Sequence, residues 1–152
     1  MRRVHLVGSL LLFCACSPSW TSEWLGEWTL ANGRSDESCD GVPSPSQSLP
    51  SASLRLTIKA RDNQSLDLRW EAMVNGAASG ECDQTAELSE PTRANLLSQA
   101  CPFSGRAYYV TEGSLTMTES KALELQWVAV VPSGRSTCRQ QWQALLVASG
   151  SL

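Results

Sequence analysis

Strict alternation of apolar and polar side chains in two neighbouring segments constrains the fold of this chain most. The segments cover residues 54–60 and 66–72, and the turn-forming residues Asp62, Asn63 and Gln64 lie between them. Successive side chains of a β-strand point to opposite faces of the sheet. A period of two therefore predicts two half-buried strands joined as a hairpin.

The register of this hairpin also follows from the pattern. Apolar side chains must face apolar side chains on the buried side, and a three-residue loop then selects one pairing of the two strands. The same pairing places opposite charges across from each other on the exposed side, which contributes roughly 0.2–1 kcal/mol per pair. The expected pairs are Ile58 with Leu68 and Leu56 with Trp70 on the inner face, and Lys59 with Asp67 and Arg55 with Glu71 on the outer face.

Short alternating segments recur along the rest of the chain, separated by turn residues. Together with the hairpin they amount to about eight strands, most of them linked to the next by a tight turn. The sequence therefore predicts an all-β domain, an antiparallel meander that closes into a small barrel, with a β-sandwich as the alternative. The other expected strands cover residues 24–31, 77–88, 106–111, 115–117, 123–127 and 137–148.

Two segments depart from the strand pattern. Residues 33–51 are rich in Ser, Pro, Gly and Asp, which predicts a long exposed loop. Residues 89–100 begin with a Ser that is followed by an acidic residue and a Pro, and they carry apolar side chains at Leu96 and Leu97. Because Pro102 then stops the run, this segment predicts one short helix.

The first residues have the order of a signal peptide. Arg2 and Arg3 precede an apolar run over residues 4–13, and small residues follow this run. That order is typical of a segment that enters a translocon and is then cleaved. An apolar run of about ten residues is too short to span a bilayer, which takes about 20 residues as a helix. We therefore expect a signal peptide over residues 1–15.

Cys16 is the expected site of lipidation. Ala15 before it fits a degenerate bacterial lipobox, in which the cysteine becomes the acylated first residue of the mature protein; cleavage after Ser17 is the alternative. The mature protein then has a tether over residues 16–22 and one domain over residues 23–152. We expect it in the bacterial cell envelope or secreted, with the lipid anchor as its one contact with a membrane.

Four cysteines remain in the chain after Cys16, and an even number in an exported protein predicts disulfides. Their spacings are too wide for the close cysteine pairs of a zinc site. If the first and last strands pair to close the barrel, the segment after the first strand lies beside the start of the last strand. This geometry joins Cys39 to Cys138 and leaves Cys82 for Cys101, with about 5 kcal/mol expected from the long loop and about 3 kcal/mol from the short one.

The composition disfavours several activities. His5 is the one histidine of the chain and leaves with the signal peptide, which excludes histidine-based catalysis and histidine-ligated metal sites from the mature protein. Without Arg2 and Arg3, ten basic residues stand against 15 acidic ones, and a net charge of about −5 disfavours nucleic acid as a partner. We expect a monomeric, non-enzymatic protein without a cofactor or a metal.

Four tryptophans and one methionine are the candidates for a ligand cavity. Trp28, Trp70, Trp127 and Trp142 fall on the inner faces of the expected strands, and Met117 lies among them. In a barrel of eight strands such side chains either line a cavity for a small apolar ligand or fill the interior themselves. The pattern alone leaves both interpretations open.

A second cluster of side chains has the composition of a protein interface. Tyr108 and Tyr109 are close in sequence to Phe103 and Arg106. Tyrosine and arginine are enriched among the residues that contribute most to protein–protein binding. The alternative is an ordinary strand that exposes one tyrosine on each face.

Residues 24–30, with the sequence Trp-Leu-Gly-Glu-Trp-Thr-Leu, resemble the G-x-W signature that opens the first strand of lipocalins and related calycin barrels. The resemblance implies a calycin-like barrel in which Trp28 plugs one end and the open end holds a small apolar ligand. The second motif of that family, T-D-Y, is not matched by residues 106–109. The same opening also resembles periplasmic inhibitors of secreted metalloproteases, which implies a protein partner instead.

These observations lead to three functional hypotheses. The first is an envelope lipoprotein that binds a small apolar ligand in its barrel. The second is a protein-interaction module, such as a protease inhibitor, that uses the N-terminal segment or the segment 33–51 as its contact. The third is a structural envelope lipoprotein without a ligand.

Overall fold

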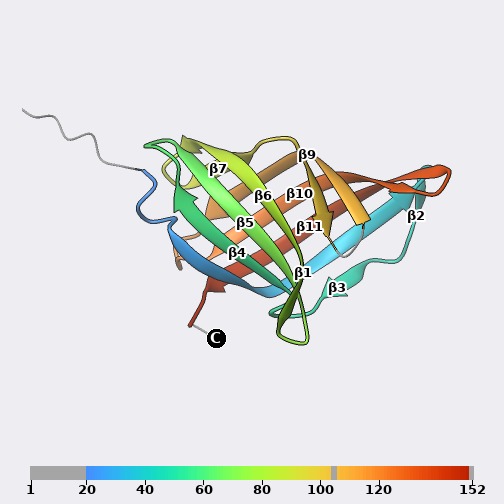
Figure 1. Cartoon of the computed structure of the whole chain (residues 1–152), viewed down its shortest axis with the longest axis horizontal. Helices are drawn as coiled ribbons and strands as arrows, with labels where there is room; N and C mark the ends of the chain where they lie inside the picture. Colours follow the sequence, from blue (N-terminus) through green and yellow to red (C-terminus); the bar gives the residue numbers. More distant parts are fainter. Residues whose placement is uncertain (1–19, 104–105, 151–152) are drawn as a thin grey trace, which may run out of the picture.

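The computed structural model describes residues 20–103 and 106–150, and this part of the chain is built of β-strands and turns (Figure 1). The strands are β1 (Gly26–Cys39), β2 (Val42–Pro43), β3 (Gln47–Leu49), β4 (Leu54–Ala60), β5 (Ser65–Val74), β6 (Ala77–Glu90), β7 (Arg93–Leu96), β8 (Gln99–Phe103), β9 (Arg106–Met117), β10 (Leu123–Ser133) and β11 (Ser136–Ala148).

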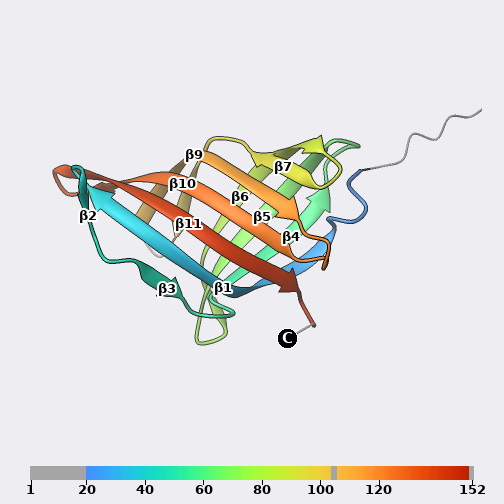
Figure 2. The same cartoon turned by 180° about the vertical axis from the view of Figure 1, so that it is seen from behind.

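Eight of these strands close into an antiparallel barrel, as Figures 1 and 2 show from opposite sides. The strand order is β10-β11-β1-β4-β5-β6-β7-β9, and β9 pairs back onto β10. β8 follows β7 and pairs with β9, whereas β2 and β3 pair with the outer half of β1. The prediction of an all-β closed barrel is confirmed, and the sandwich alternative is excluded.

The hairpin of β4 and β5 has the register expected from the sequence. The inner-face pairs Ile58–Leu68 and Leu56–Trp70 and the outer-face pairs Lys59–Asp67 and Arg55–Glu71 are all present. Arg55 Nε donates to Glu71 Oε2 at 2.9 Å, so this charged pair also forms an ion pair.

The predicted short helix over residues 89–100 is wrong. β6 runs through Glu90, a turn follows, and the chain returns as β7. Ala94 and Leu96 are buried and their neighbours are exposed, so burial alternates with the period of two of a strand rather than the 3.6 of a helix. Leu97 is exposed. The segment forms a strand despite its local preference for a helix, because β7 pairs with β6 on one side and with β9 on the other. These two pairings close the barrel.

The predicted loop over residues 33–51 is also wrong in its first part. β1 continues to Cys39, because residues 33–39 pair along their whole length with β11. Short pieces of the following chain, β2 and β3, then pair with the other side of β1. The register shift between Leu30 and Asn32 marks where β1 leaves β4 and extends beyond the barrel with β10 and β11 (Figure 1). Polar side chains do not prevent a strand whose backbone has such a partner.

One end of the barrel is closed by tryptophan. Trp24 is fully buried, and its Nε1 donates to the carbonyl of Pro91 at 3.0 Å. Trp28 Nε1 donates to the carbonyl of Trp24 at 3.1 Å. Trp28 therefore lies at the barrel end, as the lipocalin resemblance implies, and it shares the closure with Trp24. Met117 lies at this end too, since its backbone N–H donates to the carbonyl of Thr92.

The N-terminal turn belongs to this closed end. Residues 20–24 form a turn, Thr21 is buried, and Trp20 packs against the core. The last residues of the expected 16–22 tether are therefore part of the barrel. The expected signal peptide and Cys16 lie outside the described residues. Among the described residues, no helix is long and apolar enough to cross a membrane.

Candidate functional site

Two disulfides lie toward the barrel end opposite Trp24. Cys39 is bonded to Cys138 and Cys82 to Cys101, so the pairing derived from barrel closure is confirmed. The first bond joins the far end of β1 to the start of β11, and the second joins β6 to β8. Both bonds hold strands around this end of the barrel together. Two disulfides are typical of proteins that fold outside the reducing cytoplasm.

Four aromatic side chains from four strands meet between these disulfides, namely Phe103 (β8), Tyr108 (β9), Trp127 (β10) and Trp142 (β11). The rings of Trp127 and Trp142 are 4.8 Å apart between centroids and nearly perpendicular. Tyr108 lies 6.0 Å from Trp127 and 6.2 Å from Trp142, and Phe103 lies 5.9 Å from Tyr108. Edge-to-face contacts of this kind contribute about 0.5–1.5 kcal/mol beyond burial. We call these four residues, with Glu37, Arg106 and Gln140, the aromatic end.

An ion pair lies beside the aromatic rings. Arg106 Nη2 is 3.6 Å from Glu37 Oε2, and the Arg106 Cζ lies 6.0 Å from the centroid of the Tyr108 ring. The side chains are 47% and 26% exposed, respectively. Glu37 Oε1 is also 3.9 Å from Cys39 Sγ, which has no proton to donate because it is in a disulfide. This ion pair links β9 to β1, although the backbones of these two strands do not pair with each other.

Three buried polar atoms of the aromatic end have no hydrogen-bond partner among the described residues. They are Trp127 Nε1, Trp142 Nε1 and Gln140 Oε1. Trp127 lies directly opposite Trp142 in the β10–β11 ladder, and Gln140 lies opposite Glu37 in the β11–β1 ladder. A buried polar group left unpaired costs about 1–3 kcal/mol. Two donors and one acceptor in one region therefore mark this end as a candidate binding site.

The cavity found between the core side chains of the described residues is too small for a ligand. The cavity beside Trp127, which is also lined by Leu54, Trp70, Phe103 and Leu125, measures about 10 Å³. Such a volume holds about one water molecule. Four of the five cavity candidates, Trp28, Trp70, Met117 and Trp127, are buried core residues, and Trp142 is partly buried against them. The structure favours the filled-barrel interpretation for these four, and Trp127 also meets Trp142 at the aromatic end.

Gln84 is a buried polar residue that the sequence reasoning missed. Its Oε1 accepts a hydrogen bond from Trp70 Nε1 at 3.1 Å, and its Nε2 donates to the carbonyl of Leu97 at 2.8 Å. It thereby connects β6 to the break between β7 and β8. Alternation with Cys82 and Ala86 places Gln84 on the inner face and could have revealed it.

Glu37 and Gln140 were missed as well. Glu37 lay in the segment expected to be a loop, so no face was assigned to it. Gln140 is two residues before Trp142 on the last strand, and the same alternation that places Trp142 inside could have revealed it. Arg106 and Tyr108 were singled out by composition, and the structure places both at the aromatic end.

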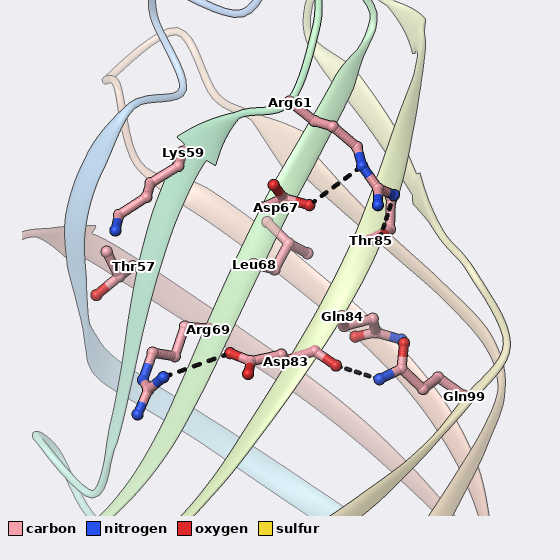
Figure 3. Close-up of a pocket in the computed structure, with 10 residues that line it drawn as sticks. All are labelled: Thr57, Lys59, Arg61, Asp67, Leu68, Arg69, Asp83, Gln84, Thr85 and Gln99. Carbon is pink, nitrogen blue, oxygen red and sulfur yellow. Dashed lines mark hydrogen bonds and ion pairs between the residues drawn. The ribbon is translucent and has the colours of Figure 1, made fainter.

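An open groove of about 450 Å³ lies on the outer face of β4, β5 and β6 (Figure 3). Its cations are mostly matched by acids: Arg61 Nε is 3.6 Å from Asp67 Oδ1, and Arg69 Nη1 is 3.7 Å from Asp83 Oδ1. Gln99 Nε2 donates to the carbonyl of Asp83 at one side of the groove. With its charges internally matched, this groove offers an ionic ligand little attraction.

The lowered pKa of Asp62 marks a turn rather than a reactive carboxylate. The backbone N–H of Gln64 donates to Asp62 Oδ1 at 2.8 Å, which stabilises the ionised form and lowers the pKa of Asp62 below its usual 3.8. The side chain is solvent-exposed in the β4–β5 turn. The cause of the shift is therefore local turn geometry.

Neither a protein family nor a curated protein matches this chain. Solved structures with a similar fold include a redesigned β-barrel (TM-score 0.45, 10% identity, 82% of this chain and 94% of that one). A structure from Bacteroides fragilis NCTC 9343 has a TM-score of 0.49 and 7% identity over 83% of this chain and 52% of that one. The monomeric sensor domain of M. tuberculosis PknI has a TM-score of 0.45 and 13% identity over 84% and 88%.

Similarity at this level concerns the fold alone. The class that the structure defines is a small, disulfide-bonded, closed antiparallel β-barrel with an architecture consistent with calycins.

Proposed function

We propose that this protein is an exported, non-enzymatic binding protein, anchored to the cell envelope through Cys16, that takes a small ligand at its aromatic end. The observation that carries the proposal is the set of three buried, unpaired polar atoms beside the aromatic rings: Trp127 Nε1, Trp142 Nε1 and Gln140 Oε1. A ligand that supplies a partner to one or more of these atoms would recover part of the free energy that they lose on burial.

The position of the site follows from the space in the barrel. The cavity of about 10 Å³ beside Trp127 is too small to hold a ligand. At the aromatic end, by contrast, Arg106 is a partly exposed side chain that forms an ion pair with Glu37. Partly exposed ion pairs contribute about 1 kcal/mol or less, so a ligand can displace Glu37 from Arg106 at a small cost in free energy.

Binding is favoured over catalysis by the groups that the site contains. Glu37 is the one carboxylate at the aromatic end among the described residues, and it is paired with Arg106. Glycosidase-type chemistry needs two carboxyl groups across the substrate. Histidine-based chemistry has no histidine after His5.

The test is native mass spectrometry of the protein purified from its own host. We expect a chain covering residues 16–152 with acyl groups, less four hydrogens for the two disulfides, together with an additional mass that is released on activation. The released mass identifies the ligand directly. A bare chain under all growth conditions would contradict ligand binding.

Matched tryptophan variants locate the ligand. Trp127→Phe and Trp142→Phe keep an aromatic ring but remove the unpaired N–H, so each should lower the fraction of protein that carries ligand. Trp28→Phe removes an indole N–H at the opposite barrel end, where it already has a partner, and should leave this fraction unchanged. An equal fraction of ligand-bound protein in all three variants would show that the ligand does not bind at the aromatic end.

A protein-interaction module is the second candidate. Val42 in β2 pairs with Cys39 at the far end of β1 and is 68% exposed, and Tyr109 in β9 pairs with Val130 in β10 and is 48% exposed. Exposed apolar side chains are common contacts for a partner protein. Residues 20–24 pack against the barrel, so an N-terminal contact would involve earlier residues. Loss of a co-purified protein in a Val42→Ser/Tyr109→Ser variant would support this alternative.

A further inference from the structure

The Arg106 guanidinium has more hydrogen-bond donors than its ion pair with Glu37 occupies. A guanidinium has five N–H donors, and the ion pair of Arg106 with Glu37 has one nitrogen–oxygen separation of 3.6 Å. A well-formed charge-assisted bond of this kind is about 2.7–2.9 Å long and often bidentate. Arg55, for comparison, approaches Glu71 to 2.9 Å. Arg106 therefore has the capacity to bind a second carboxylate in better geometry than it binds Glu37.

The surroundings of Arg106 suit a flat, apolar body next to that carboxylate. The guanidinium lies 6.0 Å from the Tyr108 ring centroid, and Tyr108 contacts both Trp127 and Trp142. Trp142 is half-buried, so part of this residue is exposed to solvent. Aromatic faces and edges pack well against planar ligands.

We infer that the ligand of the aromatic end is a planar carboxylic acid, whose carboxylate exchanges with Glu37 for Arg106. This inference rests on the proposed function and adds the chemical class of the ligand. In the free protein Glu37 occupies the guanidinium. On binding, the ligand carboxylate pairs with the Arg106 guanidinium and accepts a hydrogen bond from an unpaired indole N–H. The ligand ring packs on Tyr108 and Trp142, and Glu37 turns to solvent. Glu37 is thus an internal competitor that sets the affinity.

Charge decides how the two residues contribute. Arg106 attracts an anionic ligand, whereas Glu37 both occupies Arg106 and repels the ligand. Removal of the Glu37 charge should therefore tighten binding of a carboxylate, and removal of the Arg106 charge should weaken it. A neutral ligand of the same shape should respond little to either change.

The experiment compares two probes by isothermal titration calorimetry at low salt: 2-naphthoate and its neutral analogue 2-naphthamide. The full mature protein should bind 2-naphthoate more tightly. We expect Glu37→Gln to tighten 2-naphthoate binding about tenfold and Arg106→Gln to weaken it about tenfold, each corresponding to about 1.4 kcal/mol, with little effect on 2-naphthamide. Arg139→Gln is the matched control, since Arg139 is exposed on the outer face of β11 beside Gln140.

The outcomes separate the inference from the proposed function. Equal binding of both probes to the wild type, unchanged in Arg106→Gln, would overturn the selection of a carboxylate and leave a ligand site intact. If neither probe binds to the wild type or to Glu37→Gln, the planar-acid inference is overturned, whereas native mass spectrometry still tests the proposed function by itself. Indole N–H resonances of Trp127 and Trp142 that shift with 2-naphthoate, while those of Trp24 and Trp28 do not, would support the assigned position.

Discussion

Trp127 in β10 and Trp142 in β11 lie directly opposite each other, with their ring centroids 4.8 Å apart and their planes nearly perpendicular. Neither indole N–H has a partner among the described residues, although both nitrogens are buried. The two tryptophans at the closed end differ in this respect, since Trp24 and Trp28 both donate to backbone carbonyls. Among the described residues, the barrel therefore has one end whose tryptophan N–H groups are satisfied and one end whose tryptophan N–H groups are not.

The first prediction concerns the size of the Trp127 side chain. Trp127→Ala removes a buried ring that contacts Phe103, Tyr108 and Trp142, and it should lower the free energy of unfolding by about 3–5 kcal/mol. Urea denaturation followed by circular dichroism measures this loss. Tyr109→Ala, on the exposed face of the neighbouring strand, is the control and should cost much less; equal losses would show that the aromatic end is not a packed cluster.

The second prediction concerns Gln84. Gln84→Leu leaves both Trp70 Nε1 and the carbonyl of Leu97 without a partner, and it should cost about 2 kcal/mol or more in the free energy of unfolding. Combining it with Trp70→Phe removes one of the two unpaired groups, so the double variant should lose less than the sum of the single variants. Strict additivity in urea denaturation would argue against the direct hydrogen bond.

The third prediction concerns the close packing at Gly113. A methyl group at this position would lie 2.7 Å from Leu96 Cδ1 and 3.2 Å from the carbonyl oxygen of Gln126. Gly113→Ala should therefore destabilise the barrel by about 1–3 kcal/mol. Thermal and urea unfolding should show a smaller cost of Gly113→Ala when Leu96→Ala is already present, because that change makes room. If the loss in the free energy of unfolding is the same in both backgrounds, the strain comes from the contact with the Gln126 carbonyl oxygen instead.

The fourth prediction separates the two disulfides. The chain between Cys39 and Cys138 spans 99 positions, and that between Cys82 and Cys101 spans 19. In the loop-closure model the long loop contributes about 4.7 kcal/mol and the short one about 3 kcal/mol. Paired Cys→Ala variants compared by urea denaturation should follow this order. The reverse order would mean that native-state contacts, rather than the unfolded chain, dominate the effect.

The fifth prediction concerns acid pH. Because the pKa of Asp62 is lowered in the folded protein, its ionised form stabilises the fold above the unfolded value, near 3.8, and this contribution is lost as the pH falls through the folded pKa. Asp62→Asn should lower stability slightly at neutral pH and flatten the decline below about pH 4, so that the stabilities of the variant and the wild type converge at acid pH. Asp67→Asn is a control on the same hairpin. An identical acid decline in wild type and Asp62→Asn would contradict the turn hydrogen bond.

The hairpin of β4 and β5 shows what local pattern can predict. Its two strands are adjacent in sequence and joined by a short turn, so side-chain alternation and charge pairing were enough to derive the register that the structure has. The disulfide pairing followed from one further assumption, that the first and last strands meet. These predictions needed little knowledge of distant contacts.

The segment over residues 89–100 shows where local pattern fails. Its capping Ser, its Pro and its leucines favour a helix when the segment is considered alone. In the barrel, β6 and β9 leave a place between them that a strand must fill, and backbone hydrogen bonds on both sides outweigh a modest local preference. Residues 33–39 are strand for the same reason, because β11 offers them a partner along their whole length.

The sequence by itself determined the period of two, and with it the all-β class, the inner faces and the tryptophans that occupy them. Only the tertiary structure decided which of those tryptophans fill the core and which meet at the aromatic end. That end draws its residues from β1, β8, β9, β10 and β11, and the pairing of Glu37 with Arg106 depends on how the barrel curves. Alternation assigns a side chain to a face, whereas closure of the sheet decides which distant side chains become its neighbours.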